Sequence, residues 1–412
     1  MKKPRGFYGW KVVVSAFMGN FMATGTGFYS FNAWLVPICM AHGWSRTDIN
    51  IAPTLGVMIG LITQVLYGRI LRKRGARPIM MLGALVSGIS FALMGMTDKL
   101  WLFYVFTGLL FISNGAFNGV VPNTAVSYWF EKKRGKAMGV AATGISISGV
   151  LIPPLAMLLL DRFGLPTMFM TIGLLTWVLV ISSAAWFMKK RPEDYGMFPD
   201  GIAPEPGSQG ENPEPGTLPT GHPPLAYFLK SPAFWMIGLS FGLAMMGVVG
   251  VMIQLKPRFS DIGFSDRTAM ALTVLTALLG AGGKYGWGRL CDSVDERKVV
   301  AWSILFQIAG LAILISSKAL IPLFVFILLF GLGMGGVMST FPIVVAGFFG
   351  RNDFPKVYGY SSLFLLLQCG GYILMGRSFD LTGSYNTAYI SFIAMNIIAI
   401  ILILLAKKPK AI

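Results

Sequence analysis

Charge is scarce in this chain. Only 12% of its 412 residues are charged and 55% are hydrophobic, whereas about a quarter of the residues in a soluble globular domain are charged. This composition excludes an ordinary soluble domain and predicts a membrane protein. The net charge of +17 comes from short basic clusters between apolar runs, a pattern typical of membrane topology rather than of nucleic-acid binding.

Cysteine and histidine are also rare. The three cysteines, Cys39, Cys291 and Cys369, lie in or beside apolar segments, and their spacing fits neither a disulfide framework nor a metal site. The two histidines lie outside the apolar runs, and no Cys–His or paired-carboxylate pattern is present. We therefore expect no metal, no cofactor and no enzymatic activity.

Two further absences concern the energy source and the ligand. The sequence has no Gly-x-x-x-x-Gly-Lys-Ser/Thr motif, so ATP is not expected to drive the protein. We also expect no carboxylate inside the membrane, and an exporter of cationic drugs would need one. These absences favour a protein that handles an anion without hydrolysing a nucleotide.

Twelve apolar stretches are long enough to cross about 30 Å of hydrocarbon as helices. They are Trp10–Ile38, Ile49–Leu71, Pro78–Met96, Leu100–Val126, Gly135–Leu160, Thr167–Met188, Phe234–Leu255, Ala269–Leu290, Val299–Ser316, Leu320–Phe348, Val357–Met375 and Asn386–Ala406. The first stretch is too long for a signal peptide and lacks a cleavage site, so we interpret it as a retained span. The sequence thus predicts an all-α membrane protein with twelve transmembrane helices.

A stretch rich in Pro, Gly, Glu and Asn divides these spans into six plus six. It cannot bury enough apolar surface to fold alone and is predicted to be a flexible linker. We expect an N-terminal six-helix half at residues 1–188, a cytoplasmic linker at 189–229 and a C-terminal six-helix half at 230–412.

Lysine and arginine are distributed unevenly between the loops. With the N-terminus inside, 25 of the 34 basic residues fall on the inner side, eight fall on the outer side, and Lys284 falls within a span. An excess of Lys and Arg in cytoplasmic loops sets the orientation of a membrane protein. We expect a multi-pass protein of the plasma (inner) membrane with both termini in the cytoplasm.

The two halves are related in sequence. Residues 67–71 (YGRIL) recur 220 positions later as residues 287–291 (WGRLC), and Pro122 matches Pro342 at the same offset. A duplicated six-span unit is the architecture of alternating-access transporters, whose substrate binds near the membrane midplane between the halves. A non-transporting receptor or scaffold remains an alternative for such a doubled bundle.

Lys284 is a charged residue placed deep within a predicted span, between Gly283 and Tyr285. A charge in hydrocarbon costs several kcal/mol, and an intramembrane ionisable residue therefore suggests a functional site. No Asp or Glu is placed by the sequence where it would neutralise the ammonium, which suggests that the ligand is an anion. The alternative is a lysine that extends its stem towards the cytoplasmic interface.

Other polar residues within the spans are candidates for binding. Asn114 and Asn118 are four apart, which predicts that they share one helical face, and their amides would donate hydrogen bonds to substrate oxygens. Ser362 and Gln368 give the eleventh span a polar stripe. Hydrogen bonding between neighbouring helices is the alternative role for these polar residues.

The loop after the second span carries a recognisable pattern. It contains Gly68, Lys73, Gly75 and Arg77. These residues fit the pattern Gly-x-x-x-Asp-(Arg/Lys)-x-Gly-(Arg/Lys)-(Arg/Lys) of the same loop in the major facilitator superfamily, which the chain resembles over essentially its whole length. Arg72 stands where the acid belongs, whereas the second half keeps the acid as Asp292, followed by Arg297. The resemblance implies that Asp292, Arg72 and Arg297 take part in gating the inner side; a solvated basic loop is the alternative.

Within that superfamily the chain looks most like the oxalate/formate exchangers and the bacterial and animal monocarboxylate carriers. Residues 282–292 (GGKYGWGRLCD) are similar to their eighth span, and residues 191–196 (RPEDYG) are similar to the start of their linker. In that group an arginine occupies the place of Lys284 and holds the substrate carboxylate. The resemblance therefore implies that Lys284 binds a carboxylate, without the bidentate fork of arginine.

The resemblance also points to residues of the first half. Tyr29 would present its hydroxyl to the carboxylate, Asn118 aligns with a pore-lining aromatic residue of the exchangers, and Ile145 would form an apolar wall for a short alkyl chain. The alternatives are an interfacial anchor for Tyr29 and ordinary packing for Ile145. Leu365 takes the place of a second cation that the oxalate exchangers have, which favours a monocarboxylate over a dicarboxylate.

These observations lead to three functional readings. The first is a secondary transporter of a small monocarboxylate that works by alternating access and is coupled to protons through Lys284, because burial disfavours the charged amine and an arriving anion restores it. The second is an anion exchanger of the oxalate/formate type, and the third is the receptor or scaffold.

The expected partners are a small carboxylate, protons in the first reading and the lipid bilayer. No nucleic acid is expected as a partner, and we expect the protein to be a monomer.

Overall fold

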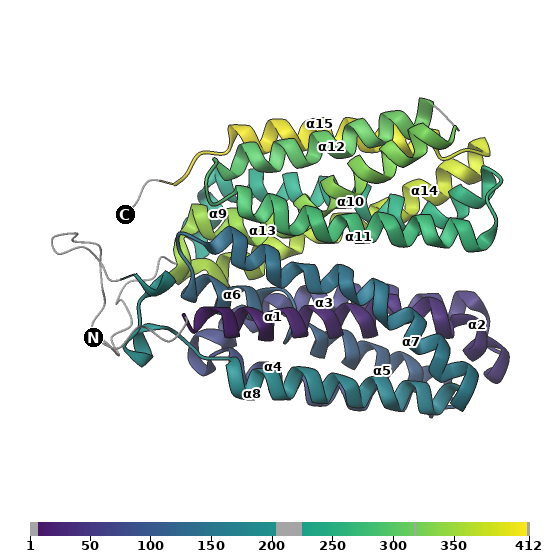
Figure 1. The fold of residues 1–412 in the computed structure, drawn as a ribbon, viewed down its shortest axis with the longest axis horizontal. Coiled ribbons are helices and arrows are strands. Elements are labelled where there is room, and N and C mark those ends of the chain that lie inside the picture. Colours follow the sequence, from purple (N-terminus) through teal and green to yellow (C-terminus); the bar gives the residue numbers. More distant parts are fainter. Residues whose placement is uncertain (1–6, 203–224, 317–318, 410–412) are drawn as a thin grey trace. The chain divides into compact units, whose positions relative to one another are not determined.

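The computed structural model describes residues 7–202, 225–316 and 319–409. Every regular element in these residues is a helix (Figure 1). Seven helical runs among them are long and apolar enough to cross a membrane. Many large apolar side chains on these helices are exposed, including Leu82, Trp186 and Ile321, as lipid-facing surfaces require. The predicted all-α membrane fold is confirmed.

Two of the long runs each contain a pair of spans, and the first, fourth, sixth and eleventh spans are divided into shorter helical elements. In α7 (Arg134–Thr176) the break lies at Gly164, and in α13 (Leu320–Ser361) it lies at Gly350; both glycines have a positive φ. The remaining elements of the first half are α1 (Gly9–Thr24), η1 (Gly25–Tyr29), α2 (Phe31–His42), α3 (Arg46–Arg74), α4 (Ala76–Met94), α5 (Leu100–Asn114), α6 (Val120–Trp129), η2 (Trp177–Ile181) and α8 (Ser182–Phe187). Those of the second half are α9 (Leu225–Lys230), α10 (Pro232–Asp261), α11 (Asp266–Leu290), α12 (Glu296–Ser316), η5 (Ser362–Gln368), α14 (Cys369–Thr382) and α15 (Asn386–Leu405).

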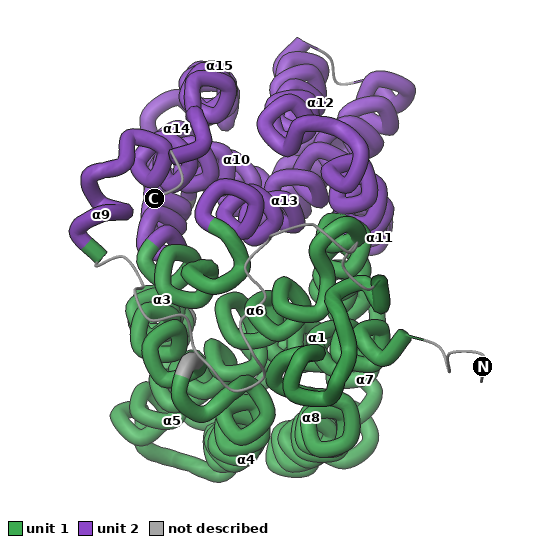
Figure 2. The backbone as a smooth tube through the Cα atoms, turned by 90° about the vertical axis from the view of Figure 1, so that its left-hand side faces the viewer, with its two compact units in different colours: residues 1–225, 350–360 green, residues 226–349, 361–412 purple. Residues whose placement is uncertain are grey.

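The chain divides into two compact units, which Figure 2 colours separately. Unit 1 comprises residues 1–225 together with residues 350–360, and unit 2 comprises residues 226–349 and 361–412. The short segment 350–360 comes from the second half of the sequence but packs with unit 1. Its contacts there include a hydrogen bond from Arg69 to the hydroxyl of Tyr360.

Matching contacts in the two units reflect the internal repeat. In unit 1 the hydroxyl of Tyr67 donates a hydrogen bond to the carbonyl oxygen of Ile112 at 2.8 Å. In unit 2 the indole Nε1 of Trp287 donates to the carbonyl oxygen of Leu332 at 3.0 Å. Both the donors and the acceptors are 220 positions apart, so the duplication extends from the sequence to specific tertiary contacts.

The turn before the second span of each unit also repeats. Gly43 and Gly263 both have a positive φ, and two residues later Ser45 and Ser265 cap the helices α3 and α11. Each serine side chain accepts a hydrogen bond from a backbone N–H three residues ahead, which satisfies one of the free donors of the first helical turn. These pairs too are 220 positions apart.

The fourth span is discontinuous, contrary to the sequence prediction. The helix α5 ends at Asn114, residues 115–119 form turns and a bend, and α6 begins at Val120. Gly119 has φ 72° and ψ −119°, a conformation that residues with a Cβ rarely adopt. The expectation that Asn114 and Asn118 share one helical face is therefore wrong, because the helix stops between them.

The predicted linker is shared between the units: residues 189–202 pack on unit 1, whereas residues 226–229 lie in α9 and belong to unit 2. Residues 203–224 lie outside the described residues, but residues 189–202 include two short 3₁₀ helices, η3 (Glu193–Tyr195) and η4 (Pro199–Gly201). The carboxylate of Asp200 accepts hydrogen bonds from the backbone N–H groups of residues 131–133, just before α7. Glu193 forms an ion pair with Arg351, which belongs to unit 1 through the segment 350–360.

Candidate anion-binding site

Lys284 lies in the second half of α11 and is 1% exposed. It is among the largest fully buried side chains of the described residues. Burial removes water from the ammonium, and a desolvated charge interacts more strongly with an ion of opposite sign than a solvated one does. The side chain therefore does not extend into bulk water, as the snorkelling alternative requires.

Glycines on α13 bring its backbone against α11 at Lys284. A Cβ atom on Gly335 would lie 2.8 Å from the backbone nitrogen of Lys284 and closer still to the carbonyl oxygen of Gly280. A Cβ on Gly283 would overlap the carbonyl oxygen of Leu332. Such close backbone approach is the usual reason for small residues between membrane helices, and here it fixes the position of the lysine.

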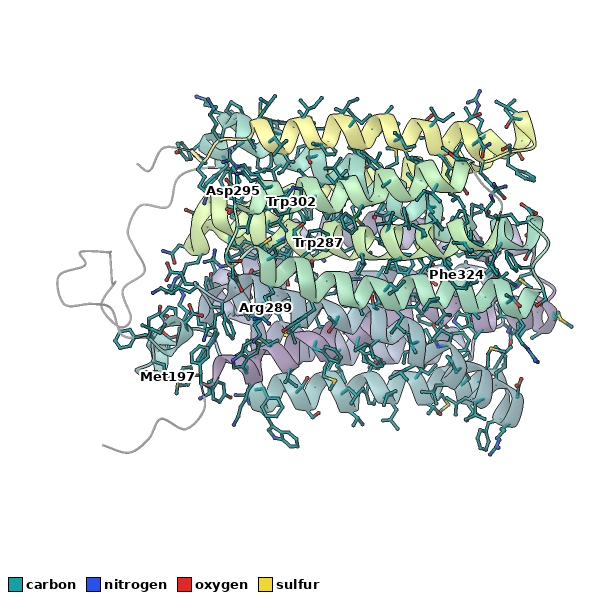
Figure 3. All side chains as sticks on the ribbon, turned by 45° about the horizontal axis from the view of Figure 1, so that its top comes forward. Met197, Trp287, Arg289, Asp295, Trp302 and Phe324 are labelled. Carbon is teal, nitrogen blue, oxygen red and sulfur yellow. The ribbon has the colours of Figure 1, made fainter. Side chains whose placement is uncertain are left out.

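Trp287 adds a hydrogen bond to the contact between α11 and α13. It lies one helical turn after Lys284, and its indole bonds the carbonyl oxygen of Leu332. Figure 3 shows Trp287 between Arg289 and Asp295, which lie towards one end of unit 2, and Phe324, which lies towards the other. The backbone that carries Lys284 is therefore held by a hydrogen bond as well as by close packing.

Tyr29 is the last residue of η1, a π-helical segment between α1 and α2. Short π-helical segments within α-helices are frequent at functional sites. The half-buried ring of Tyr29 packs on α7, where a Cβ on Gly149 would lie 2.8 Å from two ring carbons. Ile145 lies one turn earlier on α7 and is half-buried. These two predicted site residues thus lie on neighbouring elements.

Asn114 is buried at the end of α5 and joins three elements. Its Nδ2 donates to the carbonyl oxygen of Ala23 at 3.1 Å and to Oγ1 of Thr26 at 3.2 Å, while its Oδ1 accepts from Ser87 at 2.7 Å. A ligand would have to compete with these contacts. Asn114 therefore braces η1, the segment that carries Tyr29.

Asn118 lies in the break between α5 and α6 and is half-buried. Since the helix is interrupted there, its side chain is not aligned with the stripe of polar residues expected on a continuous helix. Irregular backbone at membrane depth is tolerated where it is buried in protein or lines a polar cavity. Asn118 therefore lies at the break in the fourth span rather than on one face of a continuous helix.

Ser362 and Gln368 are the first and last residues of η5. This seven-residue 3₁₀ segment interrupts the eleventh span, and runs of that length often mark a hinge. Ser362 is buried and Gln368 half-buried, with Leu365 between them. Ser362 and Gln368 therefore lie in a segment of irregular helix geometry and do not belong to a polar stripe along one face of an α-helix.

The predicted gating residues lie in different settings. Asp292 is exposed in the turn after α11. Arg297, in the first turn of α12, donates to both oxygens of Asp295 and to the carbonyl oxygen of Ala406 at 3.0 Å. The side-chain hydrogen bond from Arg297 holds the pKa of Asp295 below its ordinary value of 3.8. Arg72 lies in α3, and its side chain is outside the described part of the chain.

Sequence reasoning missed Gln64. This residue of α3 is 8% exposed, and its Oε1 accepts a hydrogen bond from the backbone N–H of Val120 at 3.0 Å. It thereby caps α6 where the fourth span is broken. The signal was available in the repeat, because Gln64 and Lys284 are 220 positions apart.

The structure brings some of the predicted residues together within each unit. In unit 1, Asn114 contacts the segment that carries Tyr29, and Tyr29 contacts α7 near Ile145. Unit 2 contains Lys284, Ser362 and Gln368. The described residues hold no cluster of three or more His, Cys, Asp or Glu side chains suited to a metal ion.

Comparisons with known proteins place this arrangement in a family. The model of the Major Facilitator Superfamily matches residues 16–283 and 236–412. The chain belongs to this superfamily. The chain is 23% identical to monocarboxylate transporter 13 of Bos taurus over 394 residues, which cover 94% of this chain and 86% of the relative. It is also 23% identical to human monocarboxylate transporter 11 over 401 residues, covering 94% and 80% respectively.

Solved structures support the same fold. The human organic anion transporter MFSD10 (TETRAN) superposes with a TM-score of 0.74 over 97% of this chain and 100% of that structure, at 17% identity. The superfamily match and these relatives identify the chain as a multi-pass membrane transporter of the monocarboxylate-transporter-like group. They also confirm the predicted twelve-helix fold.

Proposed function

We propose that this transporter carries a small monocarboxylate across the membrane by alternating access and couples its movement to protons. The observation that carries the proposal is the burial of Lys284, a cationic residue, within a membrane helix of a monocarboxylate-transporter-like protein. An ammonium in this environment is suited to pair with a carboxylate, because low polarity strengthens the attraction between the two charges.

The rest of the site would shape the substrate around that ion pair. Tyr29 and Asn118 would donate hydrogen bonds to carboxylate oxygens, and Ile145 would contact the alkyl part. Ser362 and Gln368 flank Leu365, where the resemblance to oxalate exchangers would require a second cation for a dicarboxylate. Asn114 would act indirectly by holding η1, since its amide is already engaged with α1 and α4.

Proton coupling follows from the chemistry of a buried amine. The neutral amine is compatible with an apolar site, and the charged form is favoured when an anion is beside it. A proton and a carboxylate would therefore bind together and leave together. The neutral, empty site would then return across the cycle without moving net charge.

Orientation and gating complete the proposal. The excess of Lys and Arg in the loops of one side supports an orientation with both termini in the cytoplasm, in a plasma (inner) membrane. Asp292, Arg72 and Arg297 lie in or near the loops that follow the second and eighth spans, and we propose that they control opening on that side. Arg297 would do so through Asp295 and the end of α15.

The test is uptake of radiolabelled lactate, pyruvate and acetate by proteoliposomes that contain the purified full-length protein. A pH gradient that is acidic outside should drive accumulation by the wild type. Lys284→Ala should reduce uptake at least about 100-fold, the scale expected when a desolvated charge-assisted interaction of about 3 kcal/mol is lost. Lys298→Ala is the matched control, because Lys298 is an exposed lysine of the same unit and should leave uptake unchanged.

Two measurements separate the outcomes. Uptake by Lys284→Ala equal to the wild type would refute the role of the lysine. Wild-type counterflow that needs a carboxylate inside and ignores the pH gradient would replace symport by exchange. Absence of substrate-dependent flux for every carboxylate tested would contradict the proposed substrate class.

A further inference from the structure

A second buried cation lies at the end of unit 2 that is predicted to face outward. Arg258 is in the last turn of α10 and is 9% exposed. Among the described residues it forms no ion pair, and its buried Nε–H has no hydrogen-bond partner. A cation near a helix C-terminus is favoured by the helix dipole, but the dipole does not satisfy a buried N–H donor.

Two further buried polar atoms without partners lie on α15, which packs against α10 (Figure 1). They are the hydroxyl of Tyr389, whose side chain is 0% exposed, and Oδ1 of Asn386. The two residues are three apart and so share one face of the helix. Buried polar groups in proteins are nearly always hydrogen-bonded, so three unsatisfied atoms in one region indicate a missing partner.

The contact between α10 and α15 places these atoms at one location. Tyr385, at the start of α15, donates a hydrogen bond from its hydroxyl to Oε1 of Gln254 at 3.5 Å. Gln254 is one helical turn before Arg258 on the same face of α10, and Tyr389 is one turn after Tyr385. The charge of Arg258 acts electrostatically on the hydroxyls of both tyrosines.

Another pair of buried atoms without partners in unit 2 does not form a comparable site. Nε2 of Gln307 and Oδ1 of Asn396 are also unsatisfied, but these two side chains already contact each other at 3.5 Å between Asn396 Nδ2 and Gln307 Oε1. That pair carries no charge. The group at Arg258 differs because it combines a permanent cation with a hydroxyl and an amide.

The donor set indicates the chemistry of the partner. The guanidinium and the Tyr389 hydroxyl donate hydrogen bonds, and an amide such as that of Asn386 can turn its NH₂ towards an acceptor. Arginine is well suited to phosphate and carboxylate oxygens. The exposed carboxylate of Asp261, one turn after Arg258, acts on the same tyrosines and disfavours a doubly charged ion.

We propose that Arg258, Tyr389 and Asn386 bind a phosphodiester monoanion at the outer ends of α10 and α15. The source of the phosphodiester is either the headgroup of an anionic membrane lipid or a soluble phosphodiester. This site is separate from Lys284, and the inference does not depend on the function proposed for that residue.

The experiment measures the melting temperature of the purified full-length protein in a neutral detergent at constant ionic strength. The probes are phosphatidylglycerol, phosphatidylcholine as the zwitterionic comparison whose phosphodiester is neutralised by its own choline cation, and glycerophosphoglycerol, which is the phosphatidylglycerol headgroup without its acyl chains. Ligands that bind the native state raise the melting temperature by mass action. Phosphatidylglycerol should stabilise the wild type and phosphatidylcholine should not. Stabilisation by glycerophosphoglycerol as well would identify a soluble phosphodiester site, and its absence would identify a lipid site.

The variant Arg258→Gln gives the decisive comparison. It should weaken phosphatidylglycerol binding about tenfold or more, the change expected for loss of a charge-assisted hydrogen bond. Without any probe it should melt at or above the wild-type temperature, because it removes an uncompensated buried charge. The order of the two melting curves should therefore reverse when the probe is added.

Two other variants guard the conclusion. Arg267→Gln removes an exposed arginine from the first turn of α11 and should bind like the wild type. Tyr389→Phe keeps the ring, removes only the hydroxyl and should weaken binding severalfold. The proposal is overturned if no phosphodiester stabilises the wild type, if Tyr389→Phe and Arg258→Gln bind normally, or if Arg267→Gln loses as much affinity. It is also overturned if Arg258→Gln melts lower than the wild type without probe, since Arg258 would then have a structural partner.

Discussion

Gln64 in unit 1 and Lys284 in unit 2 are equivalent residues of the internal repeat, and both are buried. Opposite Gln64 the fourth span is broken, and the side chain bonds the free N–H of Val120. In unit 2 the equivalents of Gly119 and Val120 are Ser339 and Thr340, which lie within the uninterrupted part of α13. No helix end needs capping there, so a side chain without an acceptor atom, that of Lys284, can occupy the position equivalent to Gln64.

The comparison explains why equivalent positions of the repeat hold different residue types in the two units. Broken helices expose backbone groups that must be satisfied inside a membrane, and a neutral amide does this at low cost. A lysine at that place would donate but not accept, so it would not satisfy the N–H of Val120. The amide therefore suits unit 1, and the ammonium of Lys284 in unit 2 suits the carboxylate-binding role that we propose.

The largest expected effect comes from making the two halves alike at this position. Lys284→Gln should lower monocarboxylate uptake at least about 100-fold while leaving the melting temperature equal or higher, because replacing a buried charge by a neutral side chain removes a desolvation cost. Uptake in proteoliposomes and thermal unfolding of the same preparation are measured together. A variant that keeps its uptake would show that the charge has no part in transport.

The next effect concerns the close approach of α13 to Lys284. Gly335→Ala should destabilise the protein by about 1–3 kcal/mol, since its Cβ would meet backbone atoms that cannot rotate away. The equivalent change in unit 1, Gly115→Ala, should cost less, because the new Cβ would mainly meet the side chains of Tyr67 and Gln64 at 3.0 and 3.1 Å. Gly286→Ala, which has nothing within 4 Å, is the control. Equal losses in the first two variants, measured by thermal unfolding, would contradict the packing explanation.

A smaller effect should follow from removing the cap in unit 1. Gln64→Met keeps the length of the side chain but leaves the N–H of Val120 unpaired, which should cost about 1–2 kcal/mol of stability. Uptake should fall only in proportion to the amount of folded protein. Chemical denaturation would check the first expectation. Loss of uptake in a fully folded variant would instead show that the cap belongs to the transport site.

The smallest expected effect distinguishes the loops that follow α3 and α11. Asp295 corresponds in the repeat to Gly75, so only unit 2 has the carboxylate that pairs with Arg297. Because the pKa of Asp295 is lowered in the folded protein, the pair stabilises above the ordinary pKa of 3.8 and loses this contribution as pH falls through the lowered value. Asp295→Asn should cost no more than about 1 kcal/mol, as for partly exposed ion pairs.

A pH series of unfolding curves checks this assignment. The difference in stability between wild type and Asp295→Asn should be constant at neutral pH and vanish in strong acid. A difference that grows as pH falls below 3.8 would have the wrong sign for a depressed carboxyl pKa. Such a result would remove the ion pair as its cause.

The sequence predicted the spans, their number and the repeat because these depend on long apolar runs and on an offset that can be counted. It also singled out Lys284, since a lysine in an apolar run is conspicuous without any structure. The broken fourth span was not predicted, because residues 100–126 form one long, mainly apolar stretch and periodicity does not reveal a positive φ at Gly119. Gln64 was missed because its role depends on that break.

Other parts of the site required tertiary contacts. Asn114 and Asn118 are the same residue type in one predicted span, so the sequence does not distinguish their roles. Only the structure shows that the amide of Asn114 already joins α1 and α4. The π-helical segment that ends at Tyr29 and the 3₁₀ segment from Ser362 to Gln368 are also apparent only in the structure. Local sequence preferences do not distinguish such segments from ordinary α-helix.

The membership of residues 350–360 in unit 1 has a consequence for dividing the chain. A fragment ending at residue 225 would lack the segment 350–360, which supplies Arg351 and Tyr360 to the fold of unit 1. Produced alone, the N-terminal half would be an incomplete body. If the C-terminal half is supplied as a separate polypeptide, it provides residues 350–360 to the N-terminal fragment. We therefore expect the two fragments to complement each other.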